Sequence, residues 1–126
     1  MNKLLKLLSL TIVLVLAVGA TAQAKNVIAT SKTKSVTLKK GDKLYVYLDE
    51  NGSTGFTWSR DKTPSVVKYI SEDFVMPETD AVGAGGQRKY RFKAAKVGEG
   101  TLVFKYSKSS SKEVAKTYKL KIKVKN

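Results

Sequence analysis

Residues 118–125 read Tyr-Lys-Leu-Lys-Ile-Lys-Val-Lys, and this stretch decides the fold class. Apolar or aromatic residues alternate with lysine along its whole length. Successive side chains of a β-strand point to opposite faces, so the pattern predicts a strand with one buried face and one solvated face.

The same alternation recurs upstream of this strand. Leu44, Val46 and Leu48 share one predicted face, and Tyr45 and Tyr47 lie between them, where we expect the two rings to pack in the sandwich. Further alternating runs cover residues 35–39, 56–59, 89–94 and 102–106. Glycine-, proline- and aspartate-bearing turns separate the runs. Several short strands with such punctuation predict one all-β domain, an immunoglobulin-like antiparallel β-sandwich.

The first residues have the features of a secretory signal peptide. Lys3 and Lys6 precede an apolar run over residues 7–18, and Ala22-Gln23-Ala24 follows as a small-x-small cleavage pattern. We therefore expect a signal peptide over residues 1–24, cleaved after Ala24, and a folded domain over residues 25–126. The run is short for a membrane span, although an uncleaved anchor is the alternative. The expected location is secreted or periplasmic, without a membrane span after cleavage.

The chain contains no cysteine and no histidine. This excludes disulfides, Cys- or His-based nucleophilic catalysis and metal sites built from these residues. The adjacent acid pairs Asp49-Glu50 and Glu72-Asp73 would point to opposite faces of a strand, so neither forms a two-carboxylate site. We expect no catalytic residue, no metal and no cofactor.

The formal net charge is +14. It falls to +12 without residues 1–24, which contain Lys3 and Lys6 and no acid. Most lysines occupy alternate strand positions, where we expect them to keep the surface soluble and to protect strand edges from aggregation. An anionic partner is the alternative interpretation. No nucleic-acid-binding motif is present, so no nucleic-acid partner is expected.

Two glycine-bearing turns are the strongest functional candidates. Asn51-Gly52-Ser53-Thr54-Gly55 leads into Phe56, and Gly83-Ala84-Gly85-Gly86 leads into the run at 89–94. Loops on a rigid scaffold commonly carry binding function. In an immunoglobulin-like sandwich alternate connections lie at the same end, so segments 50–55, 75–87 and 107–113 are expected to cluster.

With these loops the chain resembles the chagasin-type inhibitors of papain-like cysteine proteases. Members carry an Asn-Pro-Thr-Thr-Gly loop, a Gly-x-Gly-Gly loop and an Arg-Pro-Trp type loop on an immunoglobulin-like domain. Residues 51–55 resemble the first, with Gly52 at the proline position, and residues 83–86 match the second. The third differs, because Ser107-Lys108-Ser109-Ser110 offers Lys108 for the arginine and has no proline or tryptophan.

The resemblance implies reversible, non-covalent occlusion of the protease cleft by a monomer. Thr54 would lie near the catalytic cysteine of the enzyme, and Gly55 would allow close backbone approach. Residues 83–86 would lie along the cleft, pairing as an added strand, and the third loop would brace its other side. The implied protease-binding residues are Asn51, Gly52, Ser53, Thr54, Gly55, Phe56, Gly83, Ala84, Gly85, Gly86, Lys108, Ser109 and Ser110.

The departures from the family pattern predict a weaker or more selective inhibitor. Glycine at position 52 gives the unbound loop more conformations than proline would, which costs about 0.4–1 kcal/mol of free energy. A missing tryptophan hot spot costs about 2 kcal/mol. Asn51-Gly52-Ser53 is also an N-glycosylation sequon, so the inhibitor hypothesis requires an unmodified Asn51. The alternative function is a basic secreted or surface module that binds an anionic polymer, and salt dependence distinguishes the two.

Overall fold

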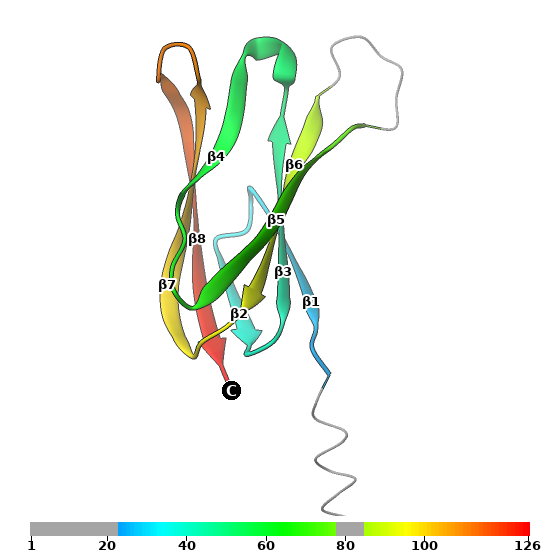
Figure 1. Cartoon of the computed structure of the whole chain (residues 1–126), viewed down its shortest axis with the longest axis vertical. Coiled ribbons are helices and arrows are strands. Elements are labelled where there is room, and N and C mark those ends of the chain that lie inside the picture. Colours follow the sequence, from blue (N-terminus) through cyan, green and yellow to red (C-terminus); the bar gives the residue numbers. More distant parts are fainter. Residues whose placement is uncertain (1–22, 78–84) are drawn as a thin grey trace, which may run out of the picture.

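Two four-stranded sheets pack face to face in the computed structural model, which describes residues 23–77 and 85–126 (Figure 1). The first sheet has the order β1-β3-β6-β5, built from β1 (Asn26–Thr30), β3 (Lys43–Glu50), β5 (Val67–Val75) and β6 (Gly86–Ala94). The second has the order β2-β8-β7-β4, built from β2 (Ser35–Lys39), β4 (Phe56–Lys62), β7 (Gly98–Lys108) and β8 (Val114–Lys125). The immunoglobulin-like sandwich predicted from the alternating runs is confirmed.

The two N-terminal strands make both sheets mixed, where purely antiparallel sheets were expected. β1 pairs in parallel with β3, and β2 pairs in parallel with the C-terminal strand β8. The short turn after Thr30 carries the chain from one sheet to the other, so neither strand reaches its partner through a hairpin. Parallel pairing needs such a crossover, whereas hairpin-linked neighbours are antiparallel.

The inward face of each strand supplies the core. Leu44, Val46 and Leu48 of β3 are fully buried, as the alternation predicts. The clearest run in the sequence behaves in the same way, because all four of its non-lysine side chains are buried. Tyr90, Phe92, Phe104 and Tyr118 add a chain of ring contacts between the sheets. Each large side chain buried here contributes about 1.5–3 kcal/mol, so the domain holds together without disulfides.

Tyr45 and Tyr47 do not pack in the sandwich, so that expectation is wrong. Their neighbours in β3 face the core, and the period of two therefore places both rings on the outer face. There they are half-buried, with the Lys89 ammonium 5.1 Å and 5.4 Å from the two ring centres. Cation–π attraction from the neighbouring strand β6 explains why two tyrosines are tolerated on the outer face.

The lysines of β8 do not protect a strand edge. β8 lies between β2 and β7, and the edge strands are β1, β5, β2 and β4. Edge protection therefore does not explain these lysines. A soluble surface or the binding of an anionic partner still can.

Asp42 anchors the end of the sandwich from which β3 starts. Its carboxylate is 5% exposed and accepts the backbone N–H groups of Lys25 (2.9 Å) and Lys39 (2.8 Å). These two backbone hydrogen bonds, the Lys25 bond first, lower the pKa of Asp42. The start of β1 is thereby fixed to the turn before β3.

The expected signal peptide, residues 1–24, lies outside the described residues except for Gln23 and Ala24. In residues 23–77 and 85–126 the only helical element is the 3-10 turn η1 (Gly52–Thr54). No helix in this part is long and apolar enough to cross a membrane.

Candidate functional site

The β3–β4 and β7–β8 connections lie at the same end of the sandwich as the last residues of β5 and the first residues of β6, at the top of Figure 1; we call this end the loop end. The β3–β4 connection lies between the β7–β8 connection and these ends of β5 and β6. A Cβ added to Gly85 would lie 3.2 Å from the carbonyl oxygen of Glu50 and 3.5 Å from Cβ of Asn51. The predicted proximity of the glycine turns is thus present in the described residues, whereas Gly83 and Ala84 lie outside them.

The loop over residues 51–55 is held by its own hydrogen bonds. Asn51 caps η1, because its side-chain Oδ1 accepts the backbone N–H of Ser53 (3.1 Å) and the Ser53 hydroxyl (2.7 Å). The Thr54 hydroxyl donates to the Asn51 carbonyl oxygen (2.8 Å) and accepts the backbone N–H of Phe56 (3.3 Å). Gly55 ends the turn with φ +81°, a conformation that favours glycine. Side-chain capping and the left-handed glycine together fix this turn.

Aromatic residues attach the loop to the sandwich beneath it. The Asn51 backbone N–H donates to the Tyr106 hydroxyl (3.3 Å), and the Trp58 indole N–H donates to the Asp49 carbonyl oxygen (2.8 Å). The Tyr106 ring contacts Phe56 at 5.5 Å and Trp58 at 4.9 Å between centroids. Both ends of the loop therefore rest on the same ring of β7.

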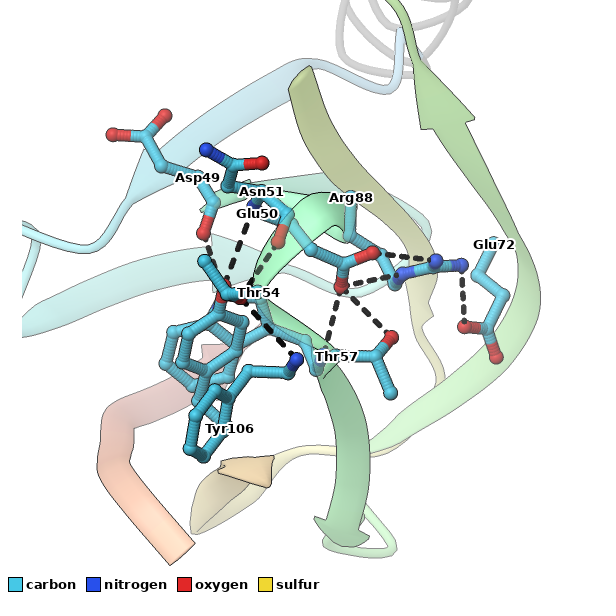
Figure 2. A network of polar contacts seen from close by, with 10 residues as sticks. Asp49, Glu50, Asn51, Thr54, Thr57, Glu72, Arg88 and Tyr106 are labelled. Atoms are coloured by element: carbon cyan, nitrogen blue, oxygen red, sulfur yellow. Dashed lines mark hydrogen bonds and ion pairs between the residues drawn. The ribbon is translucent and has the colours of Figure 1, made fainter. Parts of the chain in front are cut away.

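An ion pair between the buried Glu50 and the half-buried Arg88 lies next to the loop (Figure 2). Glu50, 5% exposed, binds Arg88 through two contacts, Nε–Oε1 at 3.0 Å and Nη2–Oε2 at 2.8 Å. The same Oε1 accepts the Trp58 backbone N–H (2.7 Å) and the Thr57 hydroxyl (3.0 Å). Glu72 lies on the other side of the guanidinium at 3.7 Å. One carboxylate thus joins β3 and β6 of the first sheet to β4 of the second.

Hydrogen bonding determines the charge of Glu50. Burial alone would raise its pKa, but the bonds from Arg88, Trp58 and Thr57 outweigh burial and lower the pKa below the usual 4.5. Arg88 responds in the opposite sense, since its bond to Glu50 raises its pKa. The pair is therefore fully ionised at neutral pH. Such a group, saturated with partners inside the fold, serves to position the loop and is not available as an acid or base.

Sequence reasoning missed both members of this pair, although a pattern for them existed. Glu50 continues the inward period of Leu44, Val46 and Leu48 by one step, and Arg88 continues the inward period of Tyr90 in the same way. A charged residue at a core position predicts a buried partner of opposite charge.

The third loop is a tight turn that packs against the first. The Lys112 backbone N–H donates to the Lys108 carbonyl oxygen (2.9 Å), and Lys112 adopts φ +58°. The Lys108 chain lies 3.5 Å from a Cβ added to Gly55, and its ammonium is 5.3 Å from the Phe56 ring centre. Ser109 and Ser110 are exposed at the tip. Lys108 therefore touches the first loop, and its charge lies beside that loop.

The second loop begins with an apolar flank. Gly86 is buried as the first residue of β6, because a Cβ there would lie 2.6 Å from Cζ of Phe74. Beside it Phe74, Val75 and Met76 are 37%, 40% and 70% exposed. A cavity of about 480 Å³ opens between this flank, the end of β3 and Asn51. Sequence reasoning did not identify this flank, since no motif marks it.

Among the described residues no group of acids could hold a metal ion. The polar side chains of Asn51, Ser53 and Thr54 bond within the first loop, and Ser109 and Ser110 are exposed beside it. This end of the molecule is equipped to bind another surface.

Comparison with known proteins identifies the arrangement. A search of curated proteins found no match. Among solved structures, the cysteine protease inhibitor EhICP2 from Entamoeba histolytica is similar with a TM-score of 0.72 and 20% identity, covering 82% of this chain and 98% of that chain. Amebosin gives 0.63 and 22%, covering 82% and 100%, and PbICP-C, solved in complex with falcipain-2, gives 0.51 and 16%, covering 82% and 93%. At these identities the likeness shows the fold.

The sequence itself establishes the family. The model of the chagasin family of peptidase inhibitors, I42, matches residues 37–124. That range runs from β2 to the end of β8 and includes all three connections at the loop end. The chain belongs to the chagasin family of peptidase inhibitors.

Proposed function

We propose that this protein inhibits papain-like cysteine proteases reversibly, without a covalent step, by placing the three loops in the active-site cleft. The family is one of inhibitors, so the chain is not an enzyme. The similar structures support the choice of target, since one is described as a cysteine protease inhibitor and another was solved in complex with falcipain-2.

One observation carries the proposal: the loop at 51–55 is already shaped before it meets a partner. The Asn51 side chain and the Thr54 hydroxyl make hydrogen bonds inside the turn, and Gly55 already has the left-handed conformation that ends it. A preformed loop loses little conformational entropy on binding, which increases affinity. The 3-10 turn also keeps the chain out of the extended conformation that added-strand recognition uses. The loop therefore blocks the cleft without offering a peptide bond for cleavage.

The flanking loops would supply contacts on the two sides of the 51–55 loop, which would enter the cleft as a wedge. Lys108 and the exposed Ser109 and Ser110 stand on one side, and Gly85 with the Val75–Met76 flank stands on the other. The third loop lacks the tryptophan of the family pattern. The exposed Met76 side chain offers an apolar contact on the opposite side of the 51–55 loop, and methionine is enriched in protein interfaces.

The signal-peptide pattern at residues 1–24 supports a secreted or periplasmic site of action. N-terminal sequencing of the exported protein should give Lys25 as the first residue. Insertion of the 51–55 loop also needs an unmodified Asn51, because a bulky glycan on its side chain would obstruct the loop that enters the cleft.

The test is inhibition of a panel of papain-like proteases by residues 25–126 and by two matched variants. Thr54→Arg places a long cation at the exposed tip of the wedge, and Thr37→Arg places the same side chain on an exposed position of β2. We expect Thr54→Arg to weaken inhibition at least tenfold, about 1.4 kcal/mol, through steric conflict in the cleft. The domain should stay folded, with a small loss of unfolding free energy from the two hydrogen bonds of the Thr54 hydroxyl. Thr37→Arg should inhibit like the parent protein.

Two results would contradict the proposal. Equal inhibition by both variants would place the contact elsewhere on the surface. No inhibition of any protease at micromolar concentrations by the parent domain would remove the function itself.

A further inference from the structure

The outer face of the second sheet is rich in lysine and lies away from the loop end. β8 alone presents four exposed lysines on this face, and β2 and β4 add others: Lys119, Lys121, Lys123, Lys125, Lys39 and Lys62. In the described part of the chain, the ion pair on this face joins Lys105 to Asp61 at 3.5 Å. β8 is an interior strand, so its four lysines have no edge to protect.

Three of these lysines, Lys62, Lys119 and Lys121, line a groove on this sheet. Its volume is about 760 Å³, and it is lined by residues of all four strands and of the turn before β2. The lysines of its lining are Lys34, Lys62, Lys119 and Lys121. None of the described residues that line it is acidic. Like charges gathered in a hollow create a positive potential that concentrates anions.

The groove selects a particular kind of anion. It contains no arginine, because Arg60, Arg88 and Arg91 contact Tyr69, Glu50 and Asp73 elsewhere. Lysine is a point charge with freely rotating donors, so the groove responds to charge density rather than to the planar geometry of a carboxylate. Its one aromatic residue, Tyr118, is buried, so no exposed ring is available for bases to stack on.

Residues with hydroxyl groups lie beside Lys121 on the two neighbouring strands. Lys121 stands between Ser35 of β2 and Thr101 of β7, and all three line the groove. A phosphate oxygen bound by a lysine could accept a further hydrogen bond from such a neighbour. Alternate residues of a strand lie about 6.6–6.8 Å apart, so the β8 row can follow a linear chain of charges.

We propose that this groove binds a linear phosphate polymer that carries no bases. β8 runs from the loop end toward the opposite end of the sandwich, and its lysine row occupies the far part of the strand. A polymer bound there leaves the loop end uncovered. The protein can then be held on a phosphate-rich polymer while its loops engage a protease.

The experiment measures binding of residues 25–126 to inorganic polyphosphate by titration at several salt concentrations. The test variant carries Lys62→Gln, Lys119→Gln and Lys121→Gln. The control variant carries Lys43→Gln, Lys68→Gln and Lys93→Gln, three exposed lysines that neighbour one another across the first sheet. Both variants lose the same net charge. We expect at least tenfold weaker binding for the test variant only, and a loss of about 2 from the log–log salt slope.

Protease inhibition is measured on the same variants as an independent assay. The test variant should inhibit like the parent, and polyphosphate should leave inhibition unchanged, so a failure of this proposal is separable from a failure of the inhibitor function. Equal loss of binding in the two variants would overturn the proposal, because it would reduce the effect to net charge. Tighter binding of single-stranded DNA, or binding only to anionic phosphatidylglycerol vesicles, would also overturn it.

Discussion

Replacing Gly52 by proline should make this protein a better inhibitor. Gly52 is the first residue of η1 and has a negative φ, and a Cβ there would meet no atom within 4 Å. Asn51, which precedes it, has φ −113° and ψ 103°, the extended conformation that a following proline requires. Within the described residues no backbone hydrogen bond uses the Gly52 N–H. Proline at position 52 therefore fits without backbone strain and without the loss of a backbone hydrogen bond.

The magnitude follows from the unbound loop. A compatible proline removes unfolded and open-loop conformations and stabilises by about 0.4–1 kcal/mol. We expect the free energy of unfolding to rise by that amount. Where the open-loop ensemble limits binding, the inhibition constant should fall about 2- to 5-fold. Urea denaturation and steady-state inhibition of a papain-like protease measure the two effects on the same sample.

Gly55→Ala is the matched control in the same loop. Its φ of +81° strains any other residue, so alanine should destabilise the domain and weaken inhibition. Weaker inhibition by Gly52→Pro, with stability raised, would show that the bound loop differs from the free one. Lower stability for Gly52→Pro would refute the backbone reasoning.

Four further predictions concern the supports of the loop end and the N-terminal anchor. Glu50→Gln should cost about 3 kcal/mol of unfolding free energy in urea, since it leaves Arg88 without its main anion; a loss below 1 kcal/mol would make the pair incidental. The parent should lose stability as pH falls from 5 to 3, because the folded pKa values of Glu50 and Asp42 lie below their usual values, and Glu50→Gln should flatten this profile. Gly86→Ala should destabilise by about 1–3 kcal/mol through overpacking against Phe74, whereas Gly52→Ala should not destabilise. A chain that starts at Lys25 should be about 1 kcal/mol more stable near neutral pH than one with added preceding residues, because its α-ammonium would replace a neutral N–H on Asp42; equal melting temperatures would contradict this.

The fold could be predicted because strand patterns are local. Alternation at residues 44–48 and 118–125 reports burial directly, and the turns between such runs set the architecture. The parallel pairing of β1 and β2 could not be read in the same way. It depends on which sheet each short strand joins, a long-range choice that neither strand encodes alone.

The loop end was predictable where a motif reports backbone geometry. Asn51 and Gly55 have the cap and the left-handed conformation that their residue types favour. The Glu50–Arg88 pair was not foreseen, because its two members are brought together only when β3 and β6 pair. The apolar flank at Val75 and Met76 could not be predicted from local sequence either. These side chains are exposed because they lie at the end of β5, an edge strand, and the position of β5 in the sheet is not visible in its own sequence.

The bond between the Trp58 amide and the Glu50 carboxylate has a consequence for survival beside an active protease. Proteases cut chains that open locally, and the rate depends on the free energy of that opening. Here the start of β4 cannot fray without exposing a buried, charge-paired carboxylate. Digestion near the loop must therefore await a much larger opening of the sandwich, so the Trp58 amide should be among the slowest of β4 in hydrogen exchange.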